Sequence, residues 1–329
     1  MQMPLTRSTL TTLALASVLT AGTAMGASGD AYPSRPIRFV VPYPAGTTTD
    51  IIARQIMPKT SELLGQSVVI DNRPGAGGTI GTAFVAKAAA DGYTLVVGTP
   101  QTFAVAQSLY PEVAYDPVTG FAAIGRIARN GMVLAVNASM PVNSVADLIA
   151  HARANPGKLN YTSTGVGGTP HLAAALFANE AGLRVTHVPY PSPAQGVVAI
   201  LGGDVHFMFY SYLVLSSHAS AGRVKLLAVS TAQRFPHAPQ LPTMIEAGFQ
   251  NFDMTSWHGV YAPAKTERRI IETFSDALQR VLSDPEMLAI FRQTGNEINP
   301  AGPAEQMAFT KSERERYRKI VAVIGLTSP

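Results

Sequence analysis

The sequence predicts an α/β protein with two lobes, each built around a mostly parallel sheet that helices flank. Short apolar runs of strand length alternate with amphipathic segments of helix length from Ile37 onward, and this alternation is typical of parallel sheets. The pattern restarts at Ser144, and in each half a loop rich in glycine and threonine leads into a helix, at residues 43–50 and 163–169. Because ligands bind outside the carboxyl ends of parallel strands, we expect these two loops to face each other across one cleft.

The first lobe begins with an apolar strand at 37–41, which the first loop joins to an amphipathic helix. This helix contains Pro58, which is expected to kink it, and it ends at Gly65. The next elements are expected, in order, as a strand at 67–71, a helix at 79–90, and strands at 93–98 and 121–129.

The second lobe is expected to cover residues 132–254. Its elements are expected as strands at 133–137, 159–162, 185–189, 205–209 and 224–230, and helices at 145–154, 170–181, 194–201 and 213–221. A strand at 256–263 then returns the chain to the first lobe, which comprises residues 31–131 and 255–329. Helices at 266–283 and 303–325 complete that lobe. In the last helix, the charged run from Lys311 to Lys319 is expected to be a solvated face.

The N-terminus has the composition of a secretory signal peptide. Arg7 precedes an apolar stretch over about residues 10–19, and small residues follow as far as Ser28. The apolar stretch is shorter than the roughly 20 residues that a membrane span needs. We therefore expect residues 1–28 to be a signal peptide and the mature protein to be exported to the periplasm. The chain has no cysteine, and the remaining length is sufficient to bury a core without disulfides.

The first loop contains an uncharged group of residues, Gly46, Thr47, Thr48 and Thr49, that suits an anion. Glycine lets the backbone approach a ligand, threonine hydroxyls donate hydrogen bonds, and a helix N-terminus offers unpaired N–H groups. Such a site fits a carboxylate or another small anion. In the alternative interpretation, Thr49 or Asp50 only caps the helix and the loop is an ordinary connection.

Composition and motif spacing argue against several other functions. The chain carries 25 Lys+Arg against 21 Asp+Glu, which is too balanced for nucleic-acid binding. The glycines around Gly77 form neither a dinucleotide-binding motif nor a P-loop, and no Gly-x-Ser-x-Gly elbow surrounds Ser163. The seven histidines show no metal-binding spacing. We therefore expect no cofactor, no metal and no catalytic residue.

Several short segments resemble one family of binding proteins over nearly the whole mature chain. These segments are Tyr32–Ile37, Val41–Gly46, Asp71–Gly78, Asp91–Leu95, Pro170–Leu172, His187–Tyr190, Leu201–Gly203 and Leu241–Thr243. In order and spacing they are similar to the Bug-type solute-binding proteins of tripartite tricarboxylate transporters. The resemblance implies a periplasmic-binding-protein fold of type II, in which two lobes joined by two crossovers close on a small organic carboxylate. It also implies delivery of that ligand to the membrane permease subunits, and we expect the receptor to be a monomer.

The same resemblance implies where the ligand lies. In the family, a carboxylate is held between the loop matching Tyr43–Asp50 and the loop matching Ser163–Thr169, and the loop matching Thr99–Phe103 also faces the cleft. The residues expected at the site are Tyr43, Ala45, Gly46, Thr47, Thr48, Asp50, Thr99, Gln101, Thr102, Phe103, Ser163, Thr164, Gly165, Gly167, Gly168, Thr169, His171, Tyr210, Ser211 and Trp257. His171 either donates a hydrogen bond to the ligand or only braces its loop.

One departure from the family pattern bears on the ligand. Many members have an acidic residue followed by Asn where this chain has Tyr210-Ser211-Tyr212. An ammonium group needs a carboxylate or several carbonyl partners when it is buried, and the loops 99–103, 163–169 and 210–212 contain no Asp or Glu. An amino acid is therefore disfavoured. We expect a dicarboxylate or an aromatic acid, such as a phthalate-type diacid, to lie near the aromatic residues of the cleft, unless those rings pack inside the lobes.

Other classes of function remain as alternatives. An exported enzyme acting on an organic acid would use the same cleft, but the cleft loops show no nucleophile with a paired base. A ligand-sensing subunit for a membrane kinase would have the same sequence features as a transport receptor. A gene regulator is disfavoured because a signal peptide, and no helix-turn-helix, precedes the lobes.

Overall fold

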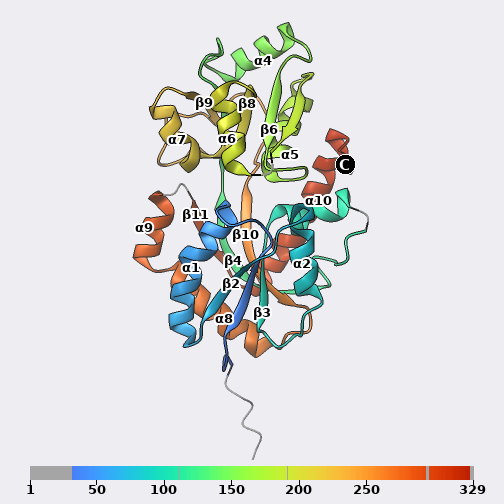
Figure 1. Cartoon of the computed structure of the whole chain (residues 1–329), viewed down its shortest axis with the longest axis vertical. Coiled ribbons are helices and arrows are strands. Elements are labelled where there is room, and N and C mark those ends of the chain that lie inside the picture. The colour runs from blue at the N-terminus through green and yellow to red at the C-terminus, as the bar shows by residue number, and fades with distance from the viewer. Residues whose placement is uncertain (1–31, 111, 191, 294–295, 327–329) are drawn as a thin grey trace, which may run out of the picture. The chain divides into compact units, whose positions relative to one another are not determined.

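The computed structural model describes residues 32–326, apart from residues 111, 191 and 294–295. In this part of the chain the strands form two mixed sheets, each with helices on both faces (Figure 1). We call the six-stranded sheet with its helices the first lobe and the five-stranded sheet with its helices the second lobe. The expected signal peptide lies outside the described residues.

The first lobe contains a six-stranded sheet with strand order β11-β4-β10-β3-β1-β2. Its strands are β1 (Ile37–Val41), β2 (Val68–Asn72), β3 (Thr94–Gly98), β4 (Phe121–Asn130), β10 (Ser256–Pro263) and β11 (Glu297–Ala301). Strand β1 pairs in parallel with β2 and β3, whereas β10 pairs antiparallel with both β3 and β4, and β11 antiparallel with β4. The strands β1 to β4 therefore run in one direction, and β10 and β11 run in the other.

The second lobe contains a five-stranded sheet with strand order β7-β6-β8-β5-β9. Its strands are β5 (Met132–Asn137), β6 (Asn160–Ser163), β7 (Thr186–Pro189), β8 (Phe207–Ser211) and β9 (Val224–Val229). Strand β6 pairs in parallel with β7 and β8, and β5 pairs antiparallel with β8 and β9. Only β5 runs in the opposite direction in this sheet. In both lobes most strands therefore run in one direction, as predicted, although each sheet also contains antiparallel pairs.

Helices cover both faces of each sheet because the strands are buried on both faces. The helices of the first lobe are α1 (Thr48–Leu64), α2 (Thr79–Ala86), α3 (Ala106–Leu109), α8 (Arg268–Leu282), α9 (Pro285–Gln293) and α10 (Pro303–Ile324). Those of the second lobe are α4 (Val145–Ala154), α5 (Thr169–Glu180), α6 (Pro193–Gly202) and α7 (Tyr212–Ser220). In β1, for example, Phe39 packs into the core cluster that contains Ile52 of α1, while Val40 packs into a second cluster on the opposite face.

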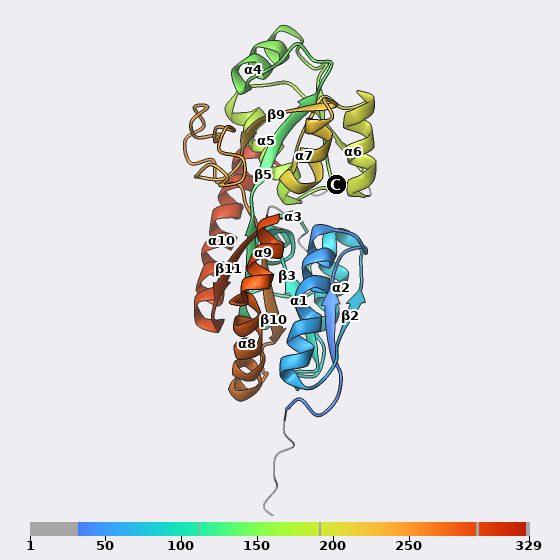
Figure 2. The ribbon, with the colours of Figure 1, turned by 90° about the vertical axis from the view of Figure 1, so that its left-hand side faces the viewer.

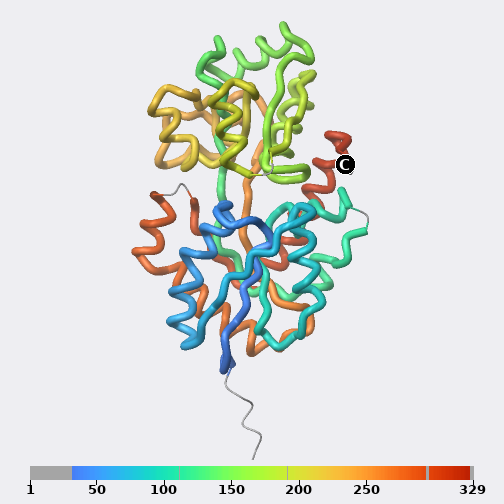
Figure 3. Tube along the Cα trace, viewed as in Figure 1, coloured from blue at the N-terminus to red at the C-terminus, as the bar shows by residue number. Residues whose placement is uncertain are grey.

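The chain passes between the two sheets along β4 and β5 and again before β10, as the green and orange segments of Figure 3 show. Gly131 separates β4 from β5, and a Cβ atom added there would come within 2.5 Å of Phe235 and Thr231. Glycine therefore permits the close approach of the loop after β9 to the first crossing. Helix α10 runs alongside both lobes and reaches α5, where Asn179 Nδ2 donates to the carbonyl of Val323 (Figure 2).

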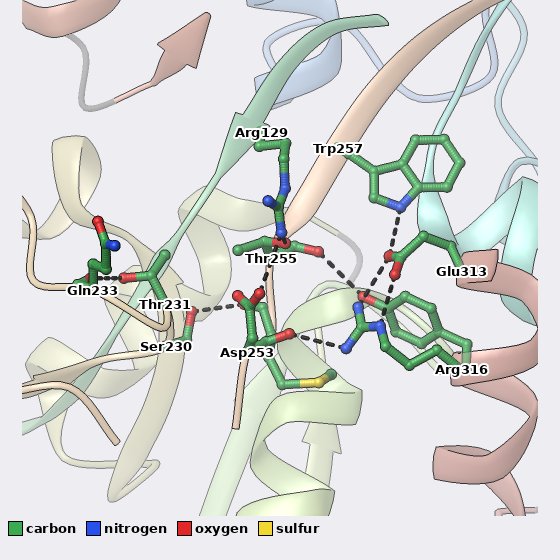
Figure 4. A network of polar contacts seen from close by, with 11 residues as sticks. Arg129, Ser230, Thr231, Gln233, Asp253, Thr255, Trp257, Glu313 and Arg316 are labelled. Carbon is green, nitrogen blue, oxygen red and sulfur yellow. Dashed lines mark hydrogen bonds and ion pairs between the residues drawn. The ribbon is translucent and has the colours of Figure 1, made fainter. Parts of the chain in front are cut away.

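Hydrogen bonds join the two crossing segments to each other (Figure 4). Ser230 Oγ accepts a hydrogen bond from the Met132 N–H and donates to the carbonyl of Met254, with distances of 2.9 and 2.7 Å. On the side of the first sheet, Arg129 donates to Asp253 at 3.3 Å and to the Thr255 hydroxyl at 3.0 Å. The crossings are thus tied together on both sides of Gly131.

Helix α10 holds the second crossing segment through an ion pair between the buried Glu313 and the partly exposed Arg316 (Figure 4). Glu313 accepts hydrogen bonds from Trp257 Nε1 at 3.0 Å and from Arg316 Nε at 2.7 Å, and Arg316 also donates to the carbonyl of Asp253. Tyr317 adds a bond from its hydroxyl to the carbonyl of Thr255. Glu313 is only 6% exposed, so the expected solvated face between Lys311 and Lys319 is wrong for this part of the helix.

Most expected elements are present, with ends shifted by a few residues. Helix α2 ends at Ala86 rather than at residue 90, and α1 continues through Pro58 to Leu64. A π-helical turn at Gln101–Val105 and the elements α3, α9 and β11 were not expected from the sequence. These elements are short, so they contain too few residues for a periodicity to identify them. In the described part of the chain, every helix is too short or too polar to cross a membrane.

Candidate ligand-binding site between the two sheets

A cavity of about 150 Å³ lies where the loops of the two lobes meet. Its wall consists of Tyr43, Pro44, Thr47, Thr48, Thr49, Thr99, Gln101, Asn130, Gly131, Met132, Thr164, Gly168, Thr169, Pro170, Pro193, Tyr210, Ser211, Ser256 and His258. The wall thus includes the loops after β1, β3, β6 and β8, together with both crossing segments. Gln101 Nε2 donates to the carbonyl of Val166 at 3.0 Å, which joins the loops of the two lobes directly.

The loop after β1 is held by a buried carboxylate. Gly46 has a φ of 80°, which glycine adopts without strain, and its N–H donates to Asp50 at 2.9 Å. Asp50 also accepts hydrogen bonds from Arg54 and Asn72, both at 2.9 Å. Burial alone raises the pKa of Asp50, but the hydrogen bonds from Arg54, Gly46 and Asn72 outweigh this effect and lower that pKa below its ordinary value. Asp50 is therefore a bracing group with an ionised side chain.

The loop after β6 is held by two stacked histidines beneath it. The rings of His171 and His187 stack with centroids 3.9 Å apart. His171 Nδ1 accepts a hydrogen bond from the Gly167 N–H at 3.1 Å, and His187 Nε2 lies 2.7 Å from Ser163 Oγ. Ser163 Oγ also accepts a hydrogen bond from the Gly165 N–H. These contacts fix the loop that carries Thr164, Gly168 and Thr169 into the cavity wall.

Helix N-termini supply partial positive charge to the cavity. Helices α1, α5 and α7 begin at Thr48, Thr169 and Tyr212, and the cavity wall contains residues from each of these N-termini. In the described part of the chain, the residues Thr47, Gly168 and Ser211 that precede these helices form no side-chain cap. The N–H groups of the first turns therefore remain able to donate to a bound anion.

The wall of the cavity is uncharged and more apolar than polar. It contains no Lys, Arg, Asp or Glu among the described residues, and its donors are hydroxyl, amide and imidazole groups. Burial raises the pKa of Tyr43 to about 12, and hydrogen bonds with Thr99 and Thr102 only partly offset that rise. Burial likewise raises the pKa of Tyr210 well above its ordinary value. Both phenols therefore stay protonated at neutral pH and can donate hydrogen bonds.

The structure brings about half of the expected site residues to the cavity wall. Those on the wall are Tyr43, Thr47, Thr48, Thr99, Gln101, Thr164, Gly168, Thr169, Tyr210 and Ser211. Those outside the wall are Ala45, Gly46, Asp50, Thr102, Phe103, Ser163, Gly165, Gly167, His171 and Trp257. Asp50, Ser163 and His171 lie one layer behind the wall, because their polar atoms are used to hold the loops.

Phe103 and Trp257 are placed in the protein core rather than in the cavity. Phe103 stacks on Tyr261 with ring centroids 3.9 Å apart, and both rings are fully buried. Trp257 is also fully buried, and its Nε1 donates to Glu313. The aromatic groups that do reach the cavity are Tyr43 and Tyr210.

Pro44 and Thr49 of the wall lie within the expected first loop. The sequence did not indicate the remaining wall residues, most of which belong to the crossing segments: Asn130, Gly131, Met132, Pro170, Pro193, Ser256 and His258. The alternation of side chains along β10 could have indicated two of these residues, Ser256 and His258. Successive side chains of a strand point to opposite faces, so a buried Trp257 places Ser256 and His258 together on the other face.

Two buried histidines, His171 and His258, and the partly buried His187 should make stability depend on pH. Burial lowers the pKa of His171 to about 3, with a further contribution from His187, and burial lowers the pKa of His187 and of His258 to about 4. In the unfolded chain these groups take up protons near pH 6.5, so between about pH 6.5 and 4 the unfolded state binds more protons. The free energy of unfolding should therefore fall as the pH falls through this window.

Urea unfolding followed by circular dichroism at several pH values between 7.5 and 4.5 tests this expectation. A free energy of unfolding that stays constant from pH 6.5 to pH 4.5 would contradict the burial of neutral imidazoles. Histidine titration followed by nuclear magnetic resonance then assigns the effect to individual rings.

The described residues contain no group of His, Cys, Asp and Glu that could hold a metal ion. The groups that the site offers to a ligand are helix N-termini, threonine and tyrosine hydroxyls, and amide and imidazole groups.

Two α/β lobes joined by two crossings, with an uncharged cavity between their loops, define a periplasmic-binding-protein fold. The chain belongs to the receptors of the tripartite tricarboxylate transporter family, because the family model described as tripartite tricarboxylate transporter family receptor matches residues 52–326. The expectation of a Bug-type receptor is confirmed by a Bordetella pertussis relative, the protein BugT. BugT is 33% identical over 309 residues, which cover 94% of this chain and 95% of BugT. A Pseudomonas sp. protein from a tcbD-tcbE intergenic region is 37% identical over 300 residues, covering 91% of this chain and 89% of that protein.

Solved structures with the same fold include two proteins with a bound acid. A Rhodopseudomonas palustris protein, Rpa4515 with adipate, superposes with a TM-score of 0.85 at 36% identity, covering 91% of this chain and all of that one. MatC from the same species, with bound malate, superposes with a TM-score of 0.81 at 27% identity, covering 88% of this chain and all of that one. The chain is therefore a solute-binding receptor of this family, and two of its structural neighbours hold a bound dicarboxylic acid.

Proposed function

We propose that this receptor captures a small dicarboxylate in the cavity between its lobes and delivers it to the permease of a tripartite tricarboxylate transporter. The composition of the cavity wall supports this proposal most strongly. The wall combines the uncapped N-termini of α1, α5 and α7 with hydroxyl and amide donors, and it has no charged side chain among the described residues. Such a wall binds anions through neutral donors. It offers no carboxylate to an ammonium group, so a free amino acid is a poor ligand.

The size and composition of the cavity support a compact acid. A volume of about 150 Å³ lies below the roughly 300–1,000 Å³ of pockets for drug-sized ligands. Tyr43 and Tyr210 give the wall aromatic surface from both lobes, which favours an acid with a flat apolar body, such as a phthalate-type aromatic diacid. The two Rhodopseudomonas palustris neighbours bind adipate and malate, so aliphatic diacids are the ligands with which an aromatic diacid should be compared.

Ligand release requires that the lobes move apart, and we propose that they rotate about the two crossings. The proposed lobes are residues 31–131 with 255–329, and residues 132–254, so that the boundaries fall at Gly131 and at the segment around Thr255. We further propose that residues 1–28 direct export to the periplasm and that the mature receptor is a monomer. Closure around the ligand would create the surface that the permease recognises.

An exported enzyme remains the second candidate, because Ser163 Oγ lies 2.7 Å from His187 Nε2. A hydroxyl and an imidazole at this distance form the first half of a nucleophile and base pair. Ser163, however, is only 2% exposed and lies outside the cavity wall. Its oxygen already accepts the Gly165 N–H, which supports a structural role and a receptor without enzymatic activity.

A thermal-shift screen of the exported protein tests the proposal. The panel contains terephthalate, phthalate, adipate, malate, benzoate and several amino acids, and each hit is followed by product analysis. A ligand at 100 times its Kd adds about 2.7 kcal/mol to the free energy of unfolding, which gives a clear shift. A shift with diacids and no product supports the receptor. Shifts with amino acids alone contradict the ligand class, and a new product supports the enzyme.

Removal of a threonine hydroxyl from either lobe should weaken ligand binding. Thr48→Val and Thr164→Val keep the shape of the side chain but remove a donor from opposite sides of the cavity. We expect each substitution to cost about 1–3 kcal/mol of binding free energy, measured by isothermal titration with the best diacid of the screen.

The matched control is Thr273→Val, which removes a hydroxyl that donates to the carbonyl of Arg269 on the exposed part of α8. This variant should bind like the wild type. Unchanged affinity in both cavity variants would refute a clamp formed by the two loops.

A further inference from the structure

A side-chain amide of the first lobe is bonded to the backbone of the second lobe beside the cavity. Gln101 follows β3 and begins the π-helical turn, and Val166 lies in the loop after β6. Gln101 Nε2 donates to the carbonyl of Val166 at 3.0 Å, although 65 positions separate the two residues. We call this contact the interlobe bond. Gln101 is also part of the cavity wall, so the bond joins the lobes next to the proposed binding site.

The amide of Gln101 occupies space that a glycine of its own lobe leaves open. Gly77 has a φ of 64°, in the left-handed region that glycine adopts without strain. A Cβ atom added at this position would come within 2.9 Å of Gln101 Nε2, which is closer than real Cβ contacts. Gly77→Ala would therefore displace the amide. The local backbone thus helps to direct Gln101 towards the second lobe.

Three residues of the first lobe that meet the second-lobe loop are spaced four positions apart. Gln101, Val105 and Leu109 belong to the helical segment formed by the π-helical turn and α3, and this spacing places them near one face. A Cβ atom added at Gly167 would come within 2.5 Å of Leu109 and 3.5 Å of Val105, so the loop backbone rests on these two buried side chains. Val166 packs against the same core cluster. The interlobe bond therefore lies beside an apolar contact between the lobes.

The loop that receives the interlobe bond is fixed within the second lobe. The Gly167 N–H donates to His171, and the Gly165 N–H donates to Ser163. The same loop contributes Thr164 and two residues after Val166 to the cavity wall. Because internal hydrogen bonds hold this loop, the interlobe bond acts on the second lobe as a whole and on the position of its wall residues.

A second contact joins the lobes across the cavity. Thr48, at the start of α1, and Tyr210, on β8, belong to the cavity wall and come from opposite lobes. A hydrogen bond between their side chains lowers the pKa of Tyr210, against the larger and opposite effect of burial. The lobes thus meet at two places in the wall, and the groups that meet there are neutral.

A bond between neutral groups suits a contact that has to open and close. When the lobes separate, water replaces the lost partner of the amide and of the carbonyl. The net effect of such a bond is therefore modest and corresponds to about a fivefold change in an equilibrium constant. Because the bond exists only while the two loops are in contact, it favours the closed form by that factor and leaves opening possible.

We propose that Gln101 is a latch between the lobes, whose bond to the Val166 carbonyl favours the closed receptor and slows the release of the bound solute. This inference rests on the proposed function and deepens it, because it names a residue that controls release. Gln101 acts as a positioning residue: it holds the loop after β6 against the loop after β3. The carrier therefore retains its solute without a fixed charge in the cavity wall.

The first test measures the separation of the lobes without any ligand. The chain has no cysteine, so Glu62→Cys on α1 and Val198→Cys on α6 introduce unique positions for spin labels. Both side chains are exposed, and both helices begin at the cavity wall, so opening of the cavity moves the labels apart. Double electron–electron resonance then gives the distribution of distances between the labels.

Gln101→Leu removes the donor and keeps a side chain of similar size. We expect the ratio of open to closed receptors to rise about fivefold in this variant. In Gln101→Glu, a carboxylate faces the Val166 carbonyl, and we expect the lobes to open further. Distance distributions that match the wild type in both variants overturn the proposal.

The matched control is Gln279→Leu. Gln279 Nε2 also donates to a backbone carbonyl at 3.0 Å, but its acceptor, Ala301, belongs to the same lobe. This variant should keep the distance distribution of the wild type. If it opens the lobes as much as Gln101→Leu does, the effect reflects a general loss of stability, and the latch is refuted.

The second test measures release. Adipate, malate and terephthalate are bound in turn and displaced in a stopped-flow experiment that follows the fluorescence of Trp257, the single tryptophan of the chain. We expect the dissociation rate to rise about fivefold in Gln101→Leu and to stay unchanged in Gln279→Leu. Faster dissociation without any change in the label distances would assign Gln101 a contact with the ligand alone, which overturns the latch.

The two tests separate the latch from the proposed function. If none of the three acids binds the wild type, the proposed function fails, while the label distances still decide whether Gln101 holds the lobes together. If an acid binds and the dissociation rate in Gln101→Leu equals that of the wild type, the proposed function stands and the control of release by Gln101 is refuted.

Discussion

Glu313→Ala should reduce the free energy of unfolding by about 3 kcal/mol, because it removes the buried carboxylate of an ion pair whose arginine is one third exposed. The substitution leaves the Trp257 Nε1–H without its acceptor and the Arg316 guanidinium without its carboxylate. Burial lowers the pKa of Arg316, but its bonds to Glu313 outweigh that effect and raise the pKa above its ordinary value. Without Glu313 the guanidinium still stays charged at neutral pH, because the ordinary pKa of arginine lies far above 7. Urea unfolding measures the loss.

Glu313→Ala should also weaken ligand binding, since Trp257 neighbours the wall residues Ser256 and His258 on β10. The matched control lies two residues further along the same helix. Glu315 is about half exposed and pairs with Arg318, so Glu315→Ala should leave both stability and affinity close to those of the wild type. If the two alanine variants unfold at the same urea concentration, the buried network is not a source of stability.

Asp50→Ala should cost about 3 kcal/mol of stability and should strongly weaken binding. Asp50 is only 2% exposed and accepts three hydrogen bonds, from Gly46, Arg54 and Asn72. Without the carboxylate, the Gly46 N–H loses the bond that fixes the loop in front of α1. This loop positions Tyr43, Thr47 and Thr48 in the cavity wall. The loss of affinity should therefore exceed the loss expected when a single donor is removed.

A change of the exposed partner separates the bracing role from simple ion pairing. Arg54 is about half exposed, and Arg54→Ala leaves the bonds of Asp50 to Gly46 and Asn72 in place. We expect this variant to lose much less stability and affinity than Asp50→Ala, measured by urea unfolding and by titration with the same diacid. Equal losses in the two variants would show that the exposed pair, rather than the buried carboxylate, holds the loop.

Local patterns predicted the fold well because strand and helix periodicities are local properties of the chain. The alternation of strands and helices, the restart after Ser144 and the loops before α1 and α5 all follow from runs of five to ten residues. Charged residues on α10 show where such reasoning fails. Glu313 and Arg316 belong to a charged run that is typical of a solvated face, yet Trp257 and the crossing segments cover them.

The site was predicted only in part, for the same reason. Loops that are continuous in sequence, such as the one containing Thr47 and Thr48, were found from glycine, threonine and the following helix. Residues on the crossing segments were missed, because Asn130 and His258 reach the cavity only after β4 and β10 pair in one sheet. Phe103 has an aromatic ring that could stack on a ligand, but it packs on Tyr261 in the core.

By itself, the sequence determined the α/β class, the two-part organisation, the uncharged character of the cleft loops and the resemblance to Bug-type receptors. These properties depend on residue types and on spacings within single segments. The tertiary structure alone decided which side chains form the wall, which brace it, and which pairs such as Thr49 with His258 meet there. Those outcomes depend on strand pairing and packing between segments far apart in the chain, which bring together groups that no local pattern connects.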